Sequence, residues 1–213
     1  RSIIPEIARR NRDAILLIVS NPVDVLTWAA WKLSGYPANR VLGSGTVLDT
    51  ARLKYLLRER LGVDSRSVHA FIIGEHGDSE LAVWSGANVS GIDLDQFCQL
   101  RGGVDNCHLD QLYRRVRDSA YEIIRRKGAT YYGIAMAVAR IAECIVRDER
   151  AMLPVSVLLQ GQYGIDGLCM SIPAVVGRNG VEDTLEIPLS PAEREALRDS
   201  AATLRGVVDS LEL

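Results

Sequence analysis

A continuous apolar run near the start of the chain limits the folds available to it. Residues 14–19 read Ala-Ile-Leu-Leu-Ile-Val, with Asn11-Arg12-Asp13 before them and Ser20-Asn21-Pro22 after them. An apolar run without alternation is typical of a strand that is buried on both faces of a parallel sheet. We therefore predict an α/β fold in which a strand over 14–19 lies in a Rossmann-type parallel sheet.

Helix and strand signals alternate after this strand. A helix is predicted over 22–33, because proline stands at its first turn and Gly35 follows its last residue. A short strand over 40–42 comes next, and a further helix is predicted from about residue 46 to residue 61. The order of helix, strand, helix, strand and helix is typical of an α/β sheet.

The rest of the chain has the pattern of an α+β domain. Asn179-Gly180 lies between two runs of alternating apolar residues, which is a strong hairpin signal. Ser190-Pro191-Ala192-Glu193 has the form of a capping box and predicts a terminal helix. The other elements that we expect are strands over 68–73, 82–84, 151–159, 170–177 and 181–187 and helices over 110–127 and 131–146.

The composition excludes several classes of protein. Of the 213 residues, 25 are Lys or Arg and 27 are Asp or Glu, which gives a net charge of −2. This balance argues against a nucleic-acid partner or a membrane-surface partner. No apolar run approaches the roughly 18 residues that a membrane-spanning helix needs, and the chain does not start with a signal-peptide pattern.

The four cysteines form no recognisable disulfide or zinc pattern. Cys98, Cys107, Cys144 and Cys169 include no Cys-x-x-Cys pair and no histidine at zinc spacing. We therefore expect no disulfide framework, no metal and a reduced, cytoplasmic setting. The chain also begins at Arg1 without an initiator methionine and within a helical pattern, so we expect it to be a fragment of a longer protein.

His76 is the first candidate for acid/base chemistry. It is one of three histidines and stands in Gly74-Glu75-His76-Gly77-Asp78, directly after an apolar run. An unperturbed imidazole titrates near pH ~6.5 and can exchange a proton at working pH. The alternative is a polar residue that merely forms the turn. The neighbouring acids, with Glu80, give poor metal-binding geometry, and we expect no metal here.

Three other residues are candidates for partners of His76. Asn21 follows a predicted parallel strand, at the end of the sheet where ligands bind. Asp49 and Arg52 are three residues apart on a helix and share a face, so a carboxylate could orient an imidazole beside a guanidinium that binds an anionic substrate. The alternatives are a turn at Asn21, a capping box from Thr46 to Asp49, and an exposed ion pair for Arg52.

Taken together, these segments resemble the lactate/malate dehydrogenase family. The segments are 20–24 (Ser-Asn-Pro-Val-Asp), 43–52 (Gly-Ser-Gly-Thr-Val-Leu-Asp-Thr-Ala-Arg), 74–80 (Gly-Glu-His-Gly-Asp-Ser-Glu) and 127–130 (Lys-Gly-Ala-Thr). The last three resemble the L-lactate dehydrogenases of this family more than its malate dehydrogenases. The resemblance implies the remnant of an NAD-binding Rossmann domain over 1–43 and an α+β catalytic domain over 44–213.

The resemblance also implies a reaction and roles for the candidate residues. His76 would exchange the proton of the lactate hydroxyl, Asp49 would orient the imidazole, and Arg52 would bind the substrate carboxylate, while hydride passes between (S)-lactate and NAD to give pyruvate and NADH. Asn21, Asp24 and Thr130 would help bind the 2-hydroxy or 2-oxo acid. The residues implied on the NAD side are Ser2, Val19, Ser20, Asn21 and Ser44.

Regulation and assembly follow from the resemblance as further expectations. Lys54 and His69 match the anion-binding pair that fructose 1,6-bisphosphate uses in allosteric members, although arginine is more usual at the first position. A homotetramer is implied as well. The glycine-rich NAD motif and the substrate-selecting loop of the family are absent from this chain, so we expect it to be nearly inactive alone. A malate or other 2-hydroxy-acid dehydrogenase and a non-catalytic remnant remain the alternatives.

Overall fold

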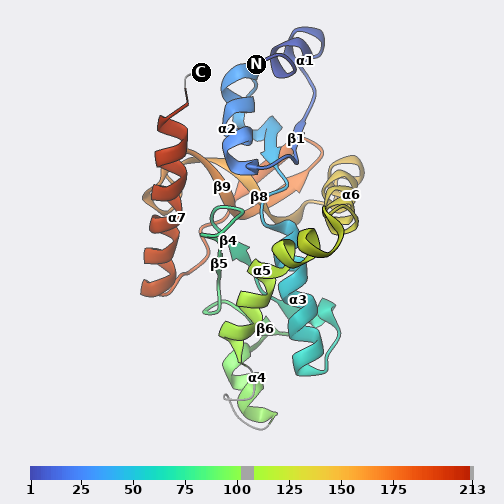
Figure 1. The fold of residues 1–213 in the computed structure, drawn as a ribbon, viewed down its shortest axis with the longest axis vertical. Helices are drawn as coiled ribbons and strands as arrows, with labels where there is room; N and C mark the ends of the chain where they lie inside the picture. The colour runs from blue at the N-terminus through green and yellow to red at the C-terminus, as the bar shows by residue number, and fades with distance from the viewer. Residues whose placement is uncertain (102–107, 212–213) are drawn as a thin grey trace.

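The computed structural model describes residues 1–101 and 108–211, and its centre is a five-stranded mixed sheet in the order β1-β2-β8-β9-β10 (Figure 1). β1 (Leu16–Ile18) and β2 (Val41–Gly43) pair in parallel, which confirms the sheet predicted from the apolar run. The sheet continues in antiparallel pairing through β8 (Ala151–Gln160), β9 (Asp166–Gly177) and β10 (Gly180–Thr184).

The parallel and antiparallel parts of the sheet meet at Gly43. Gly43 pairs with Ser156 of β8, and a Cβ atom on Gly43 would lie 2.9 Å from the Ser156 Cβ and 2.4 Å from Thr27 Oγ1. A residue with a side chain would not fit at this junction. The predicted boundary between 1–43 and 44–213 lies at this point, and it stays a prediction.

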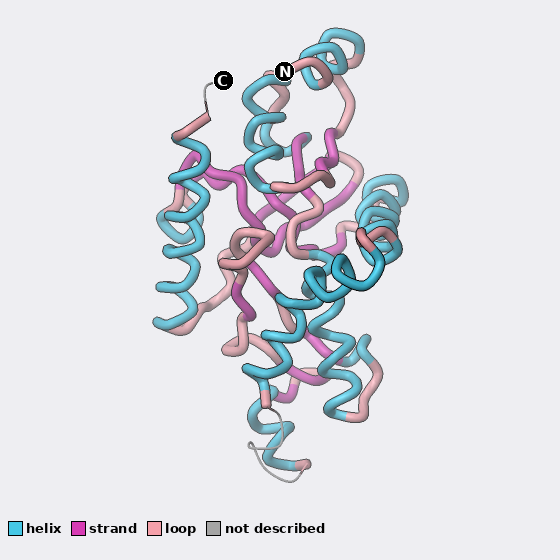
Figure 2. Tube along the Cα trace, viewed as in Figure 1, coloured by secondary structure: helices cyan, strands magenta, loops and turns pink. Residues whose placement is uncertain are grey.

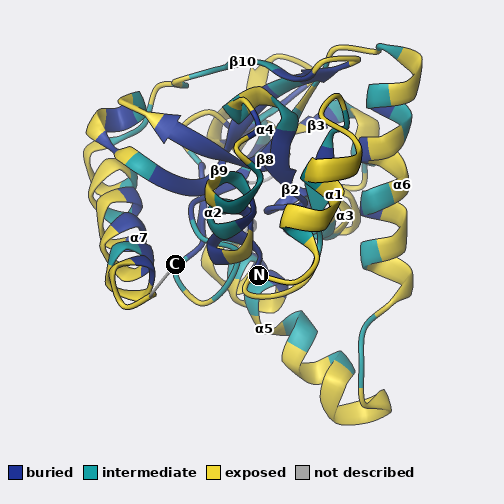
Figure 3. Cartoon of the chain, turned by 90° about the horizontal axis from the view of Figure 1, so that it is seen from above, coloured by how far each residue is buried: buried dark blue, intermediate teal, exposed yellow. Residues whose placement is uncertain are grey.

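Helices cover the sheet on its two faces and its edge. They are α1 (Ile4–Arg10), α2 (Val23–Ser34), α6 (Tyr132–Arg147) and α7 (Pro191–Asp209). In the view of Figure 3 the buried strands lie between α7 on one side and α6 on the other, and the outer faces of both helices are exposed. α2 begins one residue later than predicted, because Pro22 is its extended N-cap, and it ends at Gly35 with φ 64°.

The predicted hairpin and the predicted helix cap near the end of the chain are confirmed. Arg178 and Asn179 connect β9 to β10, and Gly180, the first residue of β10, pairs with Gly177 and has φ 90°. A Cβ atom there would lie 2.1 Å from the backbone oxygen of Asn39, so the turn requires glycine. The Ser190 hydroxyl and the Glu193 carboxylate cap each other's backbone amides at the start of α7.

A second layer of helices and short strands lies beyond the sheet (Figure 2). Its helices are α3 (Val47–Leu61), α4 (Leu94–Leu100) and α5 (Leu109–Lys127). Its strands are β3 (Val68–His69), β4 (Ile72–Ile73), β5 (Leu81–Ala82), β6 (Asn88–Val89) and β7 (Ile92–Asp93). The single strand predicted over 68–73 is therefore wrong, because β3 pairs with β6 and β4 pairs with β5 in different small sheets.

This second layer has its own apolar core. The side chains of Leu53, Leu57 and Leu61 follow one face of α3 and are buried against α5 and the short strands. Burial of a leucine side chain stabilises a fold by about 1.5–3 kcal/mol. The core holds α3 in place, and the first two turns of α3 carry the candidate residues Asp49 and Arg52.

The cysteines differ in part from the expectation. Cys144 and Cys169 are free and buried. Cys98, at the end of α4, is disulfide-bonded, so the expectation that the cysteines form no disulfide is wrong for this residue. Cys107 lies outside the described residues. Among the helices of the described part of the chain, none has the length and hydropathy needed to cross a membrane.

Candidate active site

His76 and Asp49 form the centre of the candidate site. The Nδ1 atom of His76 lies 2.7 Å from Oδ2 of Asp49, and the Asp49 carboxylate is almost fully buried in the first turn of α3. With Nδ1–H donating to this carboxylate, Nε2 on the opposite edge of the ring can exchange a proton with a substrate. This arrangement suits an imidazole that acts as a general acid and base.

Arg52 adds a positive charge to the same carboxylate. Its Nη1 atom lies 3.2 Å from Oδ1 of Asp49, and its side chain is 18% exposed. The exposed ion pair considered for Arg52 is therefore wrong, because this pair lies mostly inside the protein. The capping box considered for Asp49 is also wrong, since Thr46 makes no side-chain cap and its hydroxyl donates to the backbone oxygen of Ile72.

Asp49 raises the proton affinity of the imidazole. Burial alone would lower the pKa of His76, but the hydrogen bond and the negative charge of Asp49, with a smaller contribution from Asp24, raise this pKa above its ordinary value. Arg52 acts in the opposite direction. The site therefore keeps His76 able to hold a proton near neutral pH, as a proton donor to a carbonyl oxygen requires.

Three elements fix the loop that carries His76. The backbone N–H of His76 donates to Oδ2 of Asp24 at 2.7 Å, and that of Glu75 donates to the Ser200 hydroxyl of α7 at 2.8 Å. Gly74 has φ 95° and exchanges two backbone hydrogen bonds with Ser171 of β9. The loop is thus attached to α2, α7 and the central sheet, which restricts the position of the imidazole.

Asp24 is buried in the first turn of α2, and the structure places it behind the loop. Burial raises the pKa of its carboxyl group to about 6. Its carboxylate contacts the backbone of His76, whereas the resemblance implied a contact with substrate. Its position in this structure is that of a residue that holds the backbone of the loop that carries His76.

The carboxyl ends of the parallel strands carry the residues implied on the NAD side. Ser20 and Asn21 follow β1 and are exposed, and Val19 is partly buried beside them. Ser44 follows β2 and is buried, with its N–H donating to the Ile18 oxygen at 2.8 Å. These four residues share one edge of the sheet, and the Asn21–Pro22 peptide there is cis. Ser2 is exposed at the start of the chain, before α1, and is not brought to this edge by a hydrogen bond.

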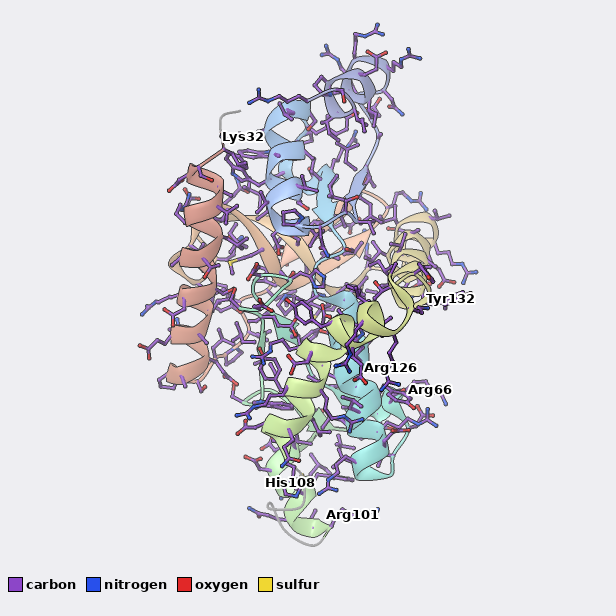
Figure 4. The ribbon with its side chains drawn as sticks, viewed as in Figure 1. Lys32, Arg66, Arg101, His108, Arg126 and Tyr132 are labelled. Atoms are coloured by element: carbon purple, nitrogen blue, oxygen red, sulfur yellow. The ribbon has the colours of Figure 1, made fainter. Side chains whose placement is uncertain are left out.

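Thr130 and Arg52 line the same pocket. This pocket has a volume of about 410 Å³ and lies between the first turns of α3 and the segment that joins α5 to α6. A larger pocket of about 830 Å³ lies between α3 and α5 and is also lined by Arg52, with Arg115 and Arg126. Figure 4 shows Arg126 near the end of α5 that faces α6. The arginine at position 52 thus borders space in which an anionic substrate can bind.

Glu80 belongs to this site, although sequence reasoning considered it only as a poor metal ligand. One ligand atom each of Asp49, His76 and Glu80 lies within 4.8 Å of the others, and Glu80 is 5% exposed. Of the neighbouring acids, Asp78 accepts a hydrogen bond from Tyr121 and Glu75 accepts one from Ser79. The sequence carries one signal for the burial of Glu80, which is its position directly before the apolar pair Leu81-Ala82.

Family models match both parts of the chain. The model described as lactate/malate dehydrogenase, NAD binding domain, matches residues 1–43. The model described as lactate/malate dehydrogenase, alpha/beta C-terminal domain, matches residues 46–212. The first of these matches implies NAD as the cofactor, as expected from the sequence.

Relatives and a solved structure agree with the family models. An L-lactate dehydrogenase of Acetivibrio thermocellus is 51% identical over 220 residues, which cover 100% of this chain and 68% of that protein. An L-lactate dehydrogenase of Synechococcus sp. is 54% identical, and the match covers 99% of this chain and 68% of that protein. The crystal structure of MGS-M5, a lactate dehydrogenase enzyme from a Medee basin deep-sea metagenome library, has a TM-score of 0.91 and 44% identity, covering 97% of this chain and 68% of that chain. The chain belongs to the lactate/malate dehydrogenase family.

Proposed function

We propose that this chain supplies the acid/base and substrate-binding part of an NAD-dependent L-lactate dehydrogenase. The observation that carries the proposal is the contact of 2.7 Å between His76 and Asp49, with Arg52 on the other oxygen of the same carboxylate. Relatives of this chain that are 49–54% identical carry the name L-lactate dehydrogenase. We further propose that residues 1–43 belong to the NAD-binding domain and residues 44–213 to the catalytic domain.

The chemistry of the proposed reaction requires a base and an anion-binding group. In lactate oxidation, His76 Nε2 accepts the hydroxyl proton, and the Asp49 carboxylate stabilises the imidazolium that forms. In pyruvate reduction, the same atom returns the proton to the carbonyl oxygen. The guanidinium of Arg52 has further N–H groups beyond the one that faces Asp49, and two of them can bind a substrate carboxylate in parallel. Asn21 and Thr130 are proposed to contact the substrate beside it, and Asp24 to hold the loop.

The proposed NAD site fits the residues at the edge of the sheet. Asn21 has an exposed side-chain amide and Ser20 an exposed hydroxyl, and these neutral donors and acceptors suit the carboxamide of a nicotinamide. The carboxyl ends of parallel strands are also the usual position of a dinucleotide. NAD would supply the acceptor for hydride. Val19 and Ser44 would complete the surface at this edge, and Ser2, which is exposed before α1, is proposed to contact the cofactor from the start of the chain.

The test is turnover by a chimera. The chimera joins residues 1–213 to the part of the Acetivibrio thermocellus L-lactate dehydrogenase that the match leaves uncovered. We expect it to reduce pyruvate with NADH with kcat/KM of about 10⁴–10⁸ M⁻¹ s⁻¹, the range of typical enzymes. Oxaloacetate is measured in parallel as a second 2-oxo acid; because the substrate-selecting loop of the chimera comes from the Acetivibrio thermocellus part, the experiment tests turnover and not the choice between the two acids. A folded chimera that reduces neither acid would leave the non-catalytic remnant as the better explanation.

Assembly and location are tested in the same preparations. We propose a homo-oligomer, with a tetramer as the specific expectation. In support of it, α6 exposes Tyr132, Met136 and Val146, with exposed fractions of 78%, 71% and 80%. Light scattering that gives the mass of a single subunit would contradict this part of the proposal. A cytoplasmic location is proposed from the family, and cell fractionation tests it.

Regulation by fructose 1,6-bisphosphate is a second candidate function. Lys54 and His69 line one pocket of about 490 Å³ together with Arg140, and three basic groups in one pocket suit a bisphosphate. Burial lowers the pKa of Lys54, which a bound phosphate would counteract. We expect the bisphosphate to lower the KM of the chimera for pyruvate, and Lys54→Gln to abolish this effect. An unchanged KM would remove the candidate.

A further inference from the structure

Glu80 is a buried acid in the centre of the candidate site. It directly precedes β5, and it lies beside Asp49 and His76. Its side-chain atom Oε1 is buried and, within residues 1–101 and 108–211, has no hydrogen-bond partner. The hydroxyl of Tyr113 on α5 donates to the backbone oxygen of Glu80. This hydrogen bond holds the main chain at Glu80 and makes no contact with its carboxyl group.

The charged groups around Glu80 do not supply a cation for it. Asp49 and Arg52 face it from α3, and Arg52 already pairs with Asp49. Arg117 faces it from α5, where it pairs with Asp118 at 3.0 Å. The other groups that face Glu80 are Glu75 and His76 on its own loop and Tyr113 on α5.

These surroundings favour the neutral acid. Burial is the largest cause and the nearby charge of Asp49 the second, and together they raise the pKa of Glu80 to about 9. Glu80 therefore holds its proton at neutral pH. Of the two carboxyl groups in the cluster with His76, Asp49 then carries a negative charge beside the positive charge of Arg52, and Glu80 does not.

We propose that Glu80 is a positioning residue whose neutral carboxyl group keeps Arg52 available to the substrate, and that loss of its proton sets the alkaline limit of the reaction. The proposal rests on the proposed function. An ionised Glu80 would attract the guanidinium of Arg52 and repel a substrate carboxylate. It would also favour the protonated form of His76, which is unable to accept the hydroxyl proton of lactate.

The pH profile of lactate oxidation by the chimera tests this role. Between about pH 6 and about pH 10, kcat/KM of the chimera with Glu80 in place should first rise as His76 loses its proton. It should then fall as the carboxyl group of Glu80 loses its proton. Glu80→Gln keeps the shape of a neutral carboxyl group, so we expect it to retain activity near neutral pH and to lose most of the alkaline fall. Glu195→Gln, which makes the same chemical change at an exposed position of α7 that does not face Glu80, should leave the alkaline fall unchanged.

The thermal stability of the 213-residue chain gives a readout that does not depend on turnover. The pKa of Glu80 in the folded state lies above its ordinary value of 4.5, at about 9. The contribution of Glu80 to stability is thus fully present below the ordinary value and is lost as the pH rises through about 9. Glu80→Gln should therefore raise the melting temperature relative to the wild-type chain at alkaline pH, and should not raise it in acid.

The outcomes separate the two proposals. A folded chimera that never oxidises lactate contradicts the proposed function, and in that case melting still tests the buried neutral acid. If the chimera is active and its alkaline fall is the same in the wild-type protein and in the Glu80→Gln variant, the inference is overturned. The inference also fails if the folded Glu80→Gln variant is inactive near neutral pH, because a neutral side chain of this shape would then not be sufficient to keep Arg52 available to the substrate.

Discussion

Replacing His76 with glutamine should lower kcat for pyruvate reduction by the chimera by about 10²- to 10⁴-fold, the range that positioned acid/base groups contribute. Glutamine has a similar reach and can hydrogen-bond to Asp49, but it does not donate a proton to a carbonyl oxygen at neutral pH. The loss should fall mainly on kcat, because Arg52 still binds the substrate carboxylate. Steady-state rates measured from NADH consumption give kcat and KM separately.

His108 offers a matched control for this variant. It is exposed at the start of α5, and Figure 4 places it near the end of the molecule that also carries Arg101. His108→Gln removes the same chemical group from a position outside the site and should leave kcat unchanged. If His76→Gln retained the wild-type rate while its circular dichroism showed a folded protein, His76 would not be the proton donor.

Local sequence patterns predicted the elements that depend on neighbouring residues. The apolar run at 14–19 contains β1, as its β-forming pattern predicted, but only Leu16 of this strand is buried, because β1 lies at the edge of the five-stranded sheet. Asn179-Gly180 predicted the hairpin, since its turn requires a residue with positive φ. Ser190 and Glu193 predicted the cap of α7 for a similarly local reason.

Contacts between distant segments were beyond local patterns. The sheet becomes mixed through the pairing of Gly43 with Ser156, and no signal near either residue specifies that partner. The break between β3 and β4 has the same cause, because their partners lie in different hairpins. The pairing of strands in the interior depends on segments far apart in the chain, whereas a helix cap depends on residues a few positions apart.

The candidate site shows the same division. His76, Asp49 and Arg52 could be chosen from chemistry and from family resemblance, and the structure brings them within hydrogen-bond distance. The buried state of Glu80 could not be predicted, because the helix α5 that covers it lies about 30 residues later in the chain and contacts it through Tyr113. From the sequence alone, Glu80 has the features of an exposed acid, and only the fold shows that it is buried beside Asp49.

Replacing Asp49 with asparagine should lower the pKa of His76 and the rate of the chimera together. Burial lowers this pKa, and the Asp49 carboxylate more than offsets burial through its hydrogen bond and its charge, whereas asparagine supplies no negative charge. NMR titration of the imidazole in the 213-residue chain measures the pKa directly. The loss in kcat should reach about 10⁴-fold, as when an orienting carboxylate behind a catalytic histidine is made neutral.

The pH dependence of this variant follows from the direction of the shift. Pyruvate reduction needs a protonated His76, so a lower pKa should move the fall of kcat/KM to lower pH in Asp49→Asn. The ion pair also stabilises the fold when His76 is charged, and this contribution is lost as the pH rises through the raised pKa. The variant should therefore lose more stability in mildly acidic than in alkaline solution. Asp118→Asn, as a control for loss of one negative charge, should keep the wild-type pKa of His76, and an equal shift in both variants would mean that Asp49 acts only through the net charge of the protein.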